Sequence, residues 1–349
     1  MKKLLLGLAC SAVLIAQTPV FKTETRILEI PVIAKDSRNS PVADLRVRDF
    51  VLLDNGIEQS ILTLEKFGKP VRTGERTPPD DPVAGRLGPR LSIIVLDKLS
   101  TPFQDQIRGH AGISEMLRKL PETPDKIAIY TLGEDLRMLC DFTSDLDIIR
   151  KIIEKDKAEQ LDIGALPLTP AASNARLQQL GTPDPFHYAE RRFEITLDAF
   201  ARIAHRMKGL PGEKSLLWMT AGFPPPENPH QFYEVSRRLR DARVRMYPID
   251  DRGLIACLIL PCPPSVYLPI GMMKELAAQT GGRAFYDSNA LAALARAALD
   301  DSRQGYLLTY APSNYRRDGL AHTVNLQVSQ KGIELRYRSG YVADLPSGQ

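Results

Sequence analysis

The feature that most constrains the fold is an alternation of apolar, strand-like runs with amphipathic stretches between residues 91 and 303. Strands flanked by helix-length segments predict a doubly wound, mostly parallel α/β sheet. The expected helices span about 104–120, 185–208, 229–242, 270–279 and 289–301, and a further one begins near residue 145. The expected strands are LSIIVLD (91–97), DKIAIYTLG (125–133), KSLLWMTAG (214–222), VRMYPID (244–250) and the short GRAFYD (282–287), with DLRMLCDF (135–142) forming a hairpin with the second.

Both ends of the chain are β-rich instead. Residues 21–67 are expected to be all-β. TRILEIPVIAKD (25–36) alternates apolar and polar side chains, SRNSPV supplies a turn, and residues 49–67 form a strand, a turn and a strand around Asn55-Gly56. Pro, Gly and charged residues fill 68–90, which predicts an exposed linker. Strand patterns return at 304–345 with no helix to cover them. Because the N-terminal module alone is too short to close a core, we expect the tail to fold back onto it and form one small β-sandwich.

The N-terminus has the pattern of an export signal. Two lysines precede the apolar run LLLGLACSAVLIA (4–16), and we expect cleavage after Ala16. Lipid attachment at Cys10 is the less favoured alternative, because Gly7 stands where a bulky aliphatic residue is wanted. No later segment stays apolar over about 18 residues, so no membrane span is expected. The mature chain is therefore predicted to be secreted or periplasmic.

The cysteines of an exported chain lie in an oxidising compartment. Cys257 and Cys262 flank a short, proline-stiffened loop and are expected to form a disulfide. No second Cys or His pair with ligand spacing follows them, which disfavours zinc. Cys140 lies in an apolar-looking run and is expected to be a buried small hydrophobe.

The charge of the chain does not indicate a nucleic-acid partner. Its formal net charge is +4, and the basic and acidic residues are mixed along the sequence. A nucleic-acid or polybasic membrane surface would show a basic stripe or cluster. We therefore expect no nucleic-acid partner.

Oxygen-bearing side chains follow the first core strand. Asp97 ends that strand, and Ser100 and Thr101 come directly after it. Open α/β sheets bind ligands at the carboxyl ends of their strands, and carboxylate and hydroxyl oxygens suit a hard cation. These residues can equally accept or donate hydrogen bonds at the start of a helix. Asp250 and Asp251 end another strand and could border the same face, although Asp-Arg-Gly is common turn material and a turn is the favoured interpretation.

Several segments together resemble the von Willebrand factor type A domain, and more closely the secreted bacterial family called acidobacterial VWFA-related proteins. The resemblance extends over nearly the whole mature chain and implies a von Willebrand factor A-like sheet. The segments that carry it are VRDFVLLDNG, IIVLDKLSTPF, DKIAIYTLGEDLRMLCDFTSD, GEKSLLWMTAGFP, VRMYPIDDRGL, TGGRAFYDSN and YRSGYV.

Type A domains often carry a metal-ion-dependent adhesion site, made of Asp-x-Ser-x-Ser, a Thr and a further Asp, which holds Mg²⁺. By the resemblance, Asp97 matches the leading Asp, Thr101 the second Ser, and Thr196 the loop threonine. Leu99 stands where the first Ser belongs, and Ala221 where the last Asp belongs.

The resemblance thus implies a degenerate adhesion site. Its possible metal ligands are Asp97, Ser100, Thr101 and Thr196, with Mg²⁺ as the ion if one is bound. A single carboxylate with hydroxyls is a poor site for Mg²⁺, which loses its water reluctantly. We expect no cofactor other than this ion.

The sequence carries no recognisable catalytic motif. It has no Gly-x-Ser-x-Gly elbow, phosphate loop or His-Glu-x-x-His helix, and its five histidines lack partners at catalytic spacing. The favoured function is a secreted or envelope-associated protein-interaction module of the adhesion type. An enzyme with an unrecognised site, or a structural component of the envelope, remains the alternative.

Overall fold

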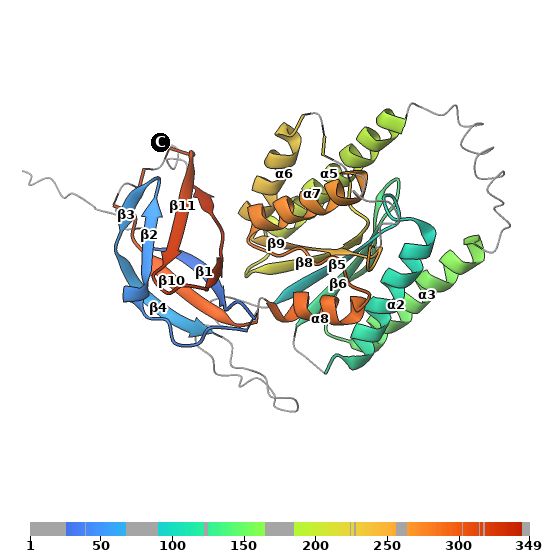
Figure 1. Cartoon of the computed structure of the whole chain (residues 1–349), viewed down its shortest axis with the longest axis horizontal. Helices are drawn as coiled ribbons and strands as arrows, with labels where there is room; N and C mark the ends of the chain where they lie inside the picture. The colour runs from blue at the N-terminus through green and yellow to red at the C-terminus, as the bar shows by residue number, and fades with distance from the viewer. Residues whose placement is uncertain are drawn as a thin grey trace, which may run out of the picture.

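The computed structural model describes residues 26–38, 40–67, 90–121, 125–164, 185–223, 225–226, 228–255, 264–301, 303–313, 315–316 and 318–343. The predicted signal segment 1–16 and the predicted Cys257–Cys262 disulfide lie outside these residues. Figure 1 shows a β-rich unit beside a unit in which helices cover a central sheet. No helix in the described part of the chain is long and apolar enough to cross a membrane.

The central sheet has five strands in the order β7-β6-β5-β8-β9. Neighbours are parallel except for β7, which runs antiparallel to β6. The register sets Val95 of the middle strand opposite Tyr130 on one side and Trp218 on the other. The mixed α/β class with a mostly parallel sheet, predicted from the alternating pattern, is therefore correct. The strands are β5 (Leu91–Asp97), β6 (Lys126–Leu132), β7 (Leu136–Thr143), β8 (Lys214–Thr220) and β9 (Val244–Asp250).

Helices cover both faces of this sheet, because successive side chains of each strand point to opposite faces. In β5, Ile93 and Val95 join one apolar core, while Ile94 and Leu96 join the other. The first core is closed by α5 (Pro185–Lys208), α6 (His230–Asp241) and α7 (Pro264–Thr280). The second is closed by α2 (Phe103–Lys119), α3 (Leu146–Gly164) and α8 (Leu291–Asp301).

The β-rich unit consists of two antiparallel sheets, with orders β12-β1-β10-β4 and β13-β11-β2-β3. Strands from the two ends of the chain alternate within it: β10 lies between β1 and β4, and β11 pairs with β2 (Figure 1). Both sheets contribute to one apolar core, for example through Val32, Leu52, Leu308 and Leu326. The early elements are β1 (Leu28–Lys35), the 3-10 turn η1 (Val47–Asp49), β2 (Phe50–Asp54), β3 (Ile57–Gln59) and β4 (Ile61–Phe67). The late ones are β10 (Gly305–Tyr310), β11 (Ala321–Val328), β12 (Glu334–Arg336) and β13 (Gly340–Val342).

A buried ion-pair group joins the two units. Asp301, the last residue of α8, lies 2.6 Å from the Lys35 Nζ of β1 and 2.9 Å from the Arg336 Nη1 of β12. Close to it, Arg245 of β9 donates a 3.2 Å hydrogen bond to the Pro31 carbonyl of β1. These charged side chains are nearly inaccessible to water, so they fix the orientation of one unit against the other.

Four local expectations differ from the structure. The strand expected after Asn55-Gly56 breaks at Ser60, so that β3 and β4 lie in different sheets, as occurs at the corner of a sandwich. Helix α7 begins at Pro264 rather than at about 270, since a proline is tolerated in the first helical turn. The expected strand 282–287 is reduced to a single bridge between Phe285 and β9. Cys140 is half-buried rather than buried, because β7 is an edge strand.

Candidate functional site

The carboxyl end of β5 is the point at which the strand order of the sheet reverses. From β5 the chain passes through α2 to β6 on one side, while β8 and β9 lie on the other side. Such a switch point is where open α/β sheets bind ligands. Asp97, Thr220 and Asp250 are the last residues of β5, β8 and β9, so their side chains meet at this edge.

Asp97 is held at the edge by three hydrogen bonds. Its Oδ1 accepts the Leu99 amide at 2.9 Å and the Ser100 amide at 2.8 Å, and its Oδ2 accepts the Thr220 hydroxyl at 2.7 Å. The side chain is buried. Burial raises the pKa of Asp97, although the bonds from Ser100, Thr220 and Leu99 oppose the shift. Asp97 therefore shapes the loop that follows β5, in the manner of a turn carboxylate.

The two hydroxyl residues of this loop are buried beside Asp97. Thr101 accepts the Ala221 amide on its Oγ1 at 2.9 Å, which ties the loop to the end of β8. Ser100 is also buried, and its Oγ has no hydrogen-bond partner among the described residues. Thus the structure brings together three of the four predicted site residues, namely Asp97, Ser100 and Thr101.

The fourth predicted residue, Thr196, lies on α5. It is fully buried, and its Oγ1 donates to the Arg192 carbonyl of the preceding turn at 2.8 Å. None of the hydrogen bonds in the described part of the chain joins Thr196 to Asp97. Leu99 packs on the apolar core beneath α5 and does not extend into the site.

The two aspartates that end β9 have different surroundings. Asp250 forms a turn, as the sequence suggested, by accepting the Arg252 amide at 3.1 Å and pairing with its guanidinium at 2.7 Å. Asp251 instead donates its amide to the Thr220 carbonyl at 3.2 Å and accepts a hydrogen bond from the Thr101 hydroxyl. Its Oδ1 is buried without a hydrogen-bond partner among the described residues.

Electrostatic repulsion is concentrated on Asp251. Burial, and then the charges of Asp97, Asp250 and Asp105, raise the pKa of Asp251 well above the ordinary aspartate value. Gly109 of α2 permits the approach, because a Cβ at that position would lie 3.3 Å from the Asp251 Oδ2. The sequence shows the Asp-Asp pair, but only the packing of α2 against Asp251 separates the roles of its two members.

A buried polar group supports the site loop from below. Lys98, next to Asp97, lies 2.7 Å from the Asp156 Oδ1 of α3, and the His110 Nε2 of α2 lies 2.7 Å from the other carboxylate oxygen. Burial would raise the pKa of Asp156, but the bonds from His110 and Lys98 hold it below the ordinary value. Gln106 adds a 2.7 Å hydrogen bond to the Thr101 carbonyl. Sequence reasoning missed this group, since no local pattern links α2 to α3.

Oxygen-bearing side chains of several kinds gather at the switch point. Across the described residues, no three or more His, Cys, Asp and Glu side chains gather in a way that could hold a metal ion. Beside Asp250, which is paired with Arg252, the switch point holds the carboxylates of Asp97 and Asp251 and the hydroxyls of Ser100 and Thr101. Oxygen atoms of these kinds suit hard cations such as Mg²⁺, Ca²⁺ and Mn²⁺.

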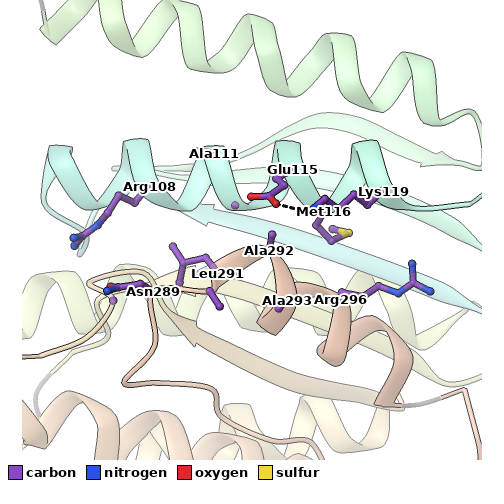
Figure 2. Close-up of a pocket in the computed structure, with 13 residues that line it drawn as sticks. Arg108, Ala111, Glu115, Met116, Lys119, Asn289, Leu291, Ala292, Ala293 and Arg296 are labelled. Carbon is purple, nitrogen blue, oxygen red and sulfur yellow. Dashed lines mark hydrogen bonds and ion pairs between the residues drawn. The ribbon is translucent and has the colours of Figure 1, made fainter.

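A second concave feature lies between α2 and α8. This groove has a volume of about 630 Å³. Figure 2 shows Glu115 and Lys119 on one helix and Leu291 and Arg296 on the other. Lys119 pairs with Glu115 at 2.6 Å, and Arg296 pairs with Asp300 at 2.6 Å. Arg108, which also lines the groove, pairs with Asp105. Each of these three cations therefore has an acidic partner from the described part of the chain.

Exposed apolar side chains surround the switch point. Phe103 begins α2 directly after the site loop and is 40% exposed, and Leu254 follows Asp251 by three residues and is 60% exposed. Tyr267 and Leu268, in the first turns of α7, are exposed as well. These turns lie at the same edge, since the Arg252 guanidinium donates to the Val266 carbonyl at 3.2 Å.

Known proteins were compared with the chain by sequence and by structure. No protein-family model matches the sequence, and no curated protein matches it. Among solved structures, an aerotolerance-related membrane protein from Bacteroides fragilis is 13% identical with a TM-score of 0.37, covering 60% of this chain and 96% of that one. BatB from Bacteroides thetaiotaomicron is 14% identical with a TM-score of 0.38, covering 62% and 98%. The manganese-loaded TRAP protein of Plasmodium vivax is 12% identical with a TM-score of 0.36, covering 75% and 96%. At such scores the fold class rests on the strand order itself, which is that of an open, doubly wound α/β sheet.

Proposed function

We propose that this chain is a protein-interaction module of the von Willebrand factor A type, which binds a protein partner through the carboxyl edge of its central sheet. The observation that carries the proposal is the set of exposed apolar side chains beside the switch point. Phe103, Leu254, Tyr267 and Leu268 border a buried polar centre there. Apolar residues gathered at one edge and surrounded by polar groups are typical of a protein-binding surface.

Hydrogen bonds hold the loop that supports this surface in one conformation. The loop after β5 is held by Asp97 from within, by Thr101 to the end of β8, and by Gln106 to α2. A loop fixed by so many hydrogen bonds loses little conformational entropy when a partner binds. The same rigidity would fix any oxygen ligands of an adhesion-type metal site, whose sequence-predicted members are Asp97, Ser100, Thr101 and Thr196.

The position of His110 favours a binding role over catalysis. This histidine lies in the α/β unit and has a carboxylate partner. His110 bonds Asp156, but its side chain is only 2% exposed and its other ring nitrogen faces the Gln106 carbonyl. A general base must reach the proton it removes. We further propose a secreted or periplasmic location for the mature chain, on the basis of the export-type segment at residues 1–16.

A capture experiment with matched surface variants tests the function. The immobilised chain, from residue 17 onward, is incubated with a bacterial envelope extract, and retained proteins are identified by mass spectrometry. We expect the double variant Phe103→Ser/Leu254→Ser to lose the protein that the wild type retains. The control Ile57→Ser/Leu62→Ser changes side chains of comparable exposure on the β-sandwich, 50% and 52% against 40% and 60%, and should retain it.

Two results would refute the proposal. One is retention of the same protein by the edge variant and its loss by the sandwich variant, which would move the binding surface to the β-rich unit. The other is the absence of any protein retained specifically by the folded wild type.

A further inference from the structure

Three arginines lie where the α/β unit meets the β-rich unit. Arg240 is in the last turn of α6, Arg243 directly precedes β9, and Arg338 lies between β12 and β13. A Cβ on Gly281, just after α7, would lie 3.5 Å from the Arg338 amide nitrogen, so the connection between β12 and β13 packs on the α/β unit. Figure 1 shows α6 and β9 on the side of that unit which faces the β-rich unit. The switch point is at the other end of β9.

The guanidinium groups of these arginines lack partners. The Arg240 Nε is buried without a hydrogen-bond partner among the described residues. Within the same part of the chain, the side chains of Arg243 and Arg338 form no hydrogen bond or ion pair. Charged groups that are shielded from water and unpaired destabilise a fold, so their presence indicates a ligand.

The carboxylates close to this arginine group are already paired. Glu213 and Asp241 are the two anions whose charges act on Arg338. Glu213 lies 3.4 Å from the Arg245 Nε, and Asp241 lies 3.2 Å from the Arg237 Nη1. The three unpaired guanidinium groups therefore have no counter-ion of their own in the described structure.

The positive charges in the group repel one another. Burial lowers the pKa of Arg338, and the charges of Arg243 and Arg240 add to that shift. Burial also lowers the pKa of Lys214, at the start of β8, to about 8, and Arg243 adds to this shift while Glu213 opposes it. An anion bound among these cations would relieve the repulsion.

The backbone of Arg243 is in a conformation that favours glycine. Its φ is +57°, in the left-handed region, and it follows Ala242, the last residue to cap α6. Glycine is the usual residue at this position after a helix, because a Cβ is strained there. An arginine at a strained backbone position indicates a role for its side chain.

We propose that Arg240, Arg243 and Arg338 bind a phosphate group at the junction of the two units. Guanidinium groups match the oxygens of a phosphate with paired hydrogen bonds. A phosphate monoester carries a charge of about −1.5 to −2 at neutral pH and so balances three cations better than a single carboxylate does. The phosphate is either the free ion or the terminal group of a larger molecule. Because Arg338 belongs to the β-rich unit, the bound group also ties the two units together.

Calorimetric titration of the chain from residue 17 onward tests this site. Inorganic phosphate and glycerol 3-phosphate are titrated separately in chloride buffer of constant ionic strength. We expect the wild type to bind one phosphate per chain, and Arg243→Gly and Arg338→Gln to bind it at least about tenfold more weakly, since each loses a charged donor. Equal binding of glycerol 3-phosphate supports the terminal phosphate of a larger molecule as the ligand, and binding of inorganic phosphate alone supports the free ion.

A matched control removes the same charge from the same helix. Arg238 is also in the last turn of α6, but its side chain is 55% exposed and pairs with Glu234 at 3.0 Å. We expect Arg238→Gln to bind phosphate like the wild type.

Thermal melting separates ligand binding from folding. Without phosphate, Arg243→Gly should melt at or above the wild-type temperature, because glycine adopts a positive φ without strain. Phosphate should then raise the melting temperature of the wild type and of Arg238→Gln more than that of Arg243→Gly.

The proposal is overturned if the folded wild type binds neither phosphate compound at millimolar concentration. It is also overturned if Arg243→Gly or Arg338→Gln binds as well as the wild type, or if Arg238→Gln loses as much affinity as they do, since the attraction would then come from net charge alone. The partner-binding edge lies at the other end of the sheet, so these results and the envelope capture are independent of each other.

Discussion

Replacing Asp301 by asparagine should strongly weaken the junction between the two units. The Asp301 side chain is 1% exposed and pairs with Lys35 at 2.6 Å and with Arg336 at 2.9 Å. Both cations are themselves largely buried, at 10% and 6% exposure. Asn keeps the volume of Asp301 but leaves these two charges without their shared counter-ion.

The burial of these three side chains sets the size of the expected loss in the free energy of unfolding. Removing one partner of a buried ion pair costs about 3–5 kcal/mol, because the remaining charge stays out of water. Arg336 keeps a second partner, Glu334 at 2.8 Å, and the new amide can still accept a hydrogen bond. We therefore expect Asp301→Asn to lower the free energy of unfolding by about 3 kcal/mol, at the lower end of that range.

Equilibrium urea unfolding, followed by far-ultraviolet circular dichroism and by tryptophan fluorescence, measures the effect. Trp218 is the single tryptophan of the sequence and lies in the core of the α/β unit. The matched control is Asp300→Asn, one residue earlier on α8, whose side chain is 40% exposed. Because the ion pairs of Asp300 lie near the surface, this control should lower the free energy of unfolding by no more than about 1 kcal/mol.

The effect should also depend on pH. Burial would raise the pKa of Asp301, but Arg336 and Lys35 outweigh it and hold the value below that of an ordinary aspartate. The ion pairs therefore contribute fully above the unfolded pKa of about 3.9, and this contribution is lost as the pH falls through the lower folded value. The stability gap between the wild type and Asp301→Asn should narrow below about pH 4. Equal losses for Asp300→Asn and Asp301→Asn, or a gap that persists unchanged in acid, would refute this reasoning.

Three further predictions concern single side chains. Gly282→Ala should lower the free energy of unfolding by about 3 kcal/mol or more, measured by thermal melting, because its Cβ would lie 1.9 Å from a backbone carbonyl oxygen of β9. The control Gly209→Ala has open space around it and should change this free energy little. Tyr310→Phe should lower the free energy of unfolding in urea by about 1.5–3 kcal/mol, since the hydroxyl donates to the buried Asp54 carboxylate at 3.0 Å. An unchanged free energy of unfolding would contradict that bond. Burial raises the pKa of the Cys140 thiol, so iodoacetamide should label it more slowly at neutral pH than a free cysteine, as peptide mass spectrometry would show.

The central sheet was predictable because its signal is local. Each of β5, β8 and β9 is buried on both faces, and this produces continuous apolar runs such as LSIIVLD. The break at Ser60 was not predictable in the same way. The residues on both sides of it favour strands, and only the closing of two sheets around a shared core assigns β3 to one sheet and β4 to the other.

Part of the candidate site was predictable because its residues are also close together in the sequence. Asp97, Ser100 and Thr101 lie within five residues of each other, so a short motif brings them together. The pairing of His110 with Asp156 joins two helices and leaves no pattern in the sequence.

The sequence by itself determined the alternating α/β framework and the position of Asp97 at the end of the first core strand, because backbone periodicity and strand ends are local properties. Only the tertiary structure decided the surroundings of Asp97. It placed the Thr196 hydroxyl in a bond within its own helix, and it brought Asp251, which follows β9, into contact with Thr101. The physical reason is that burial and charge proximity arise from the packing of separate strands and helices, which the residues along one segment do not specify.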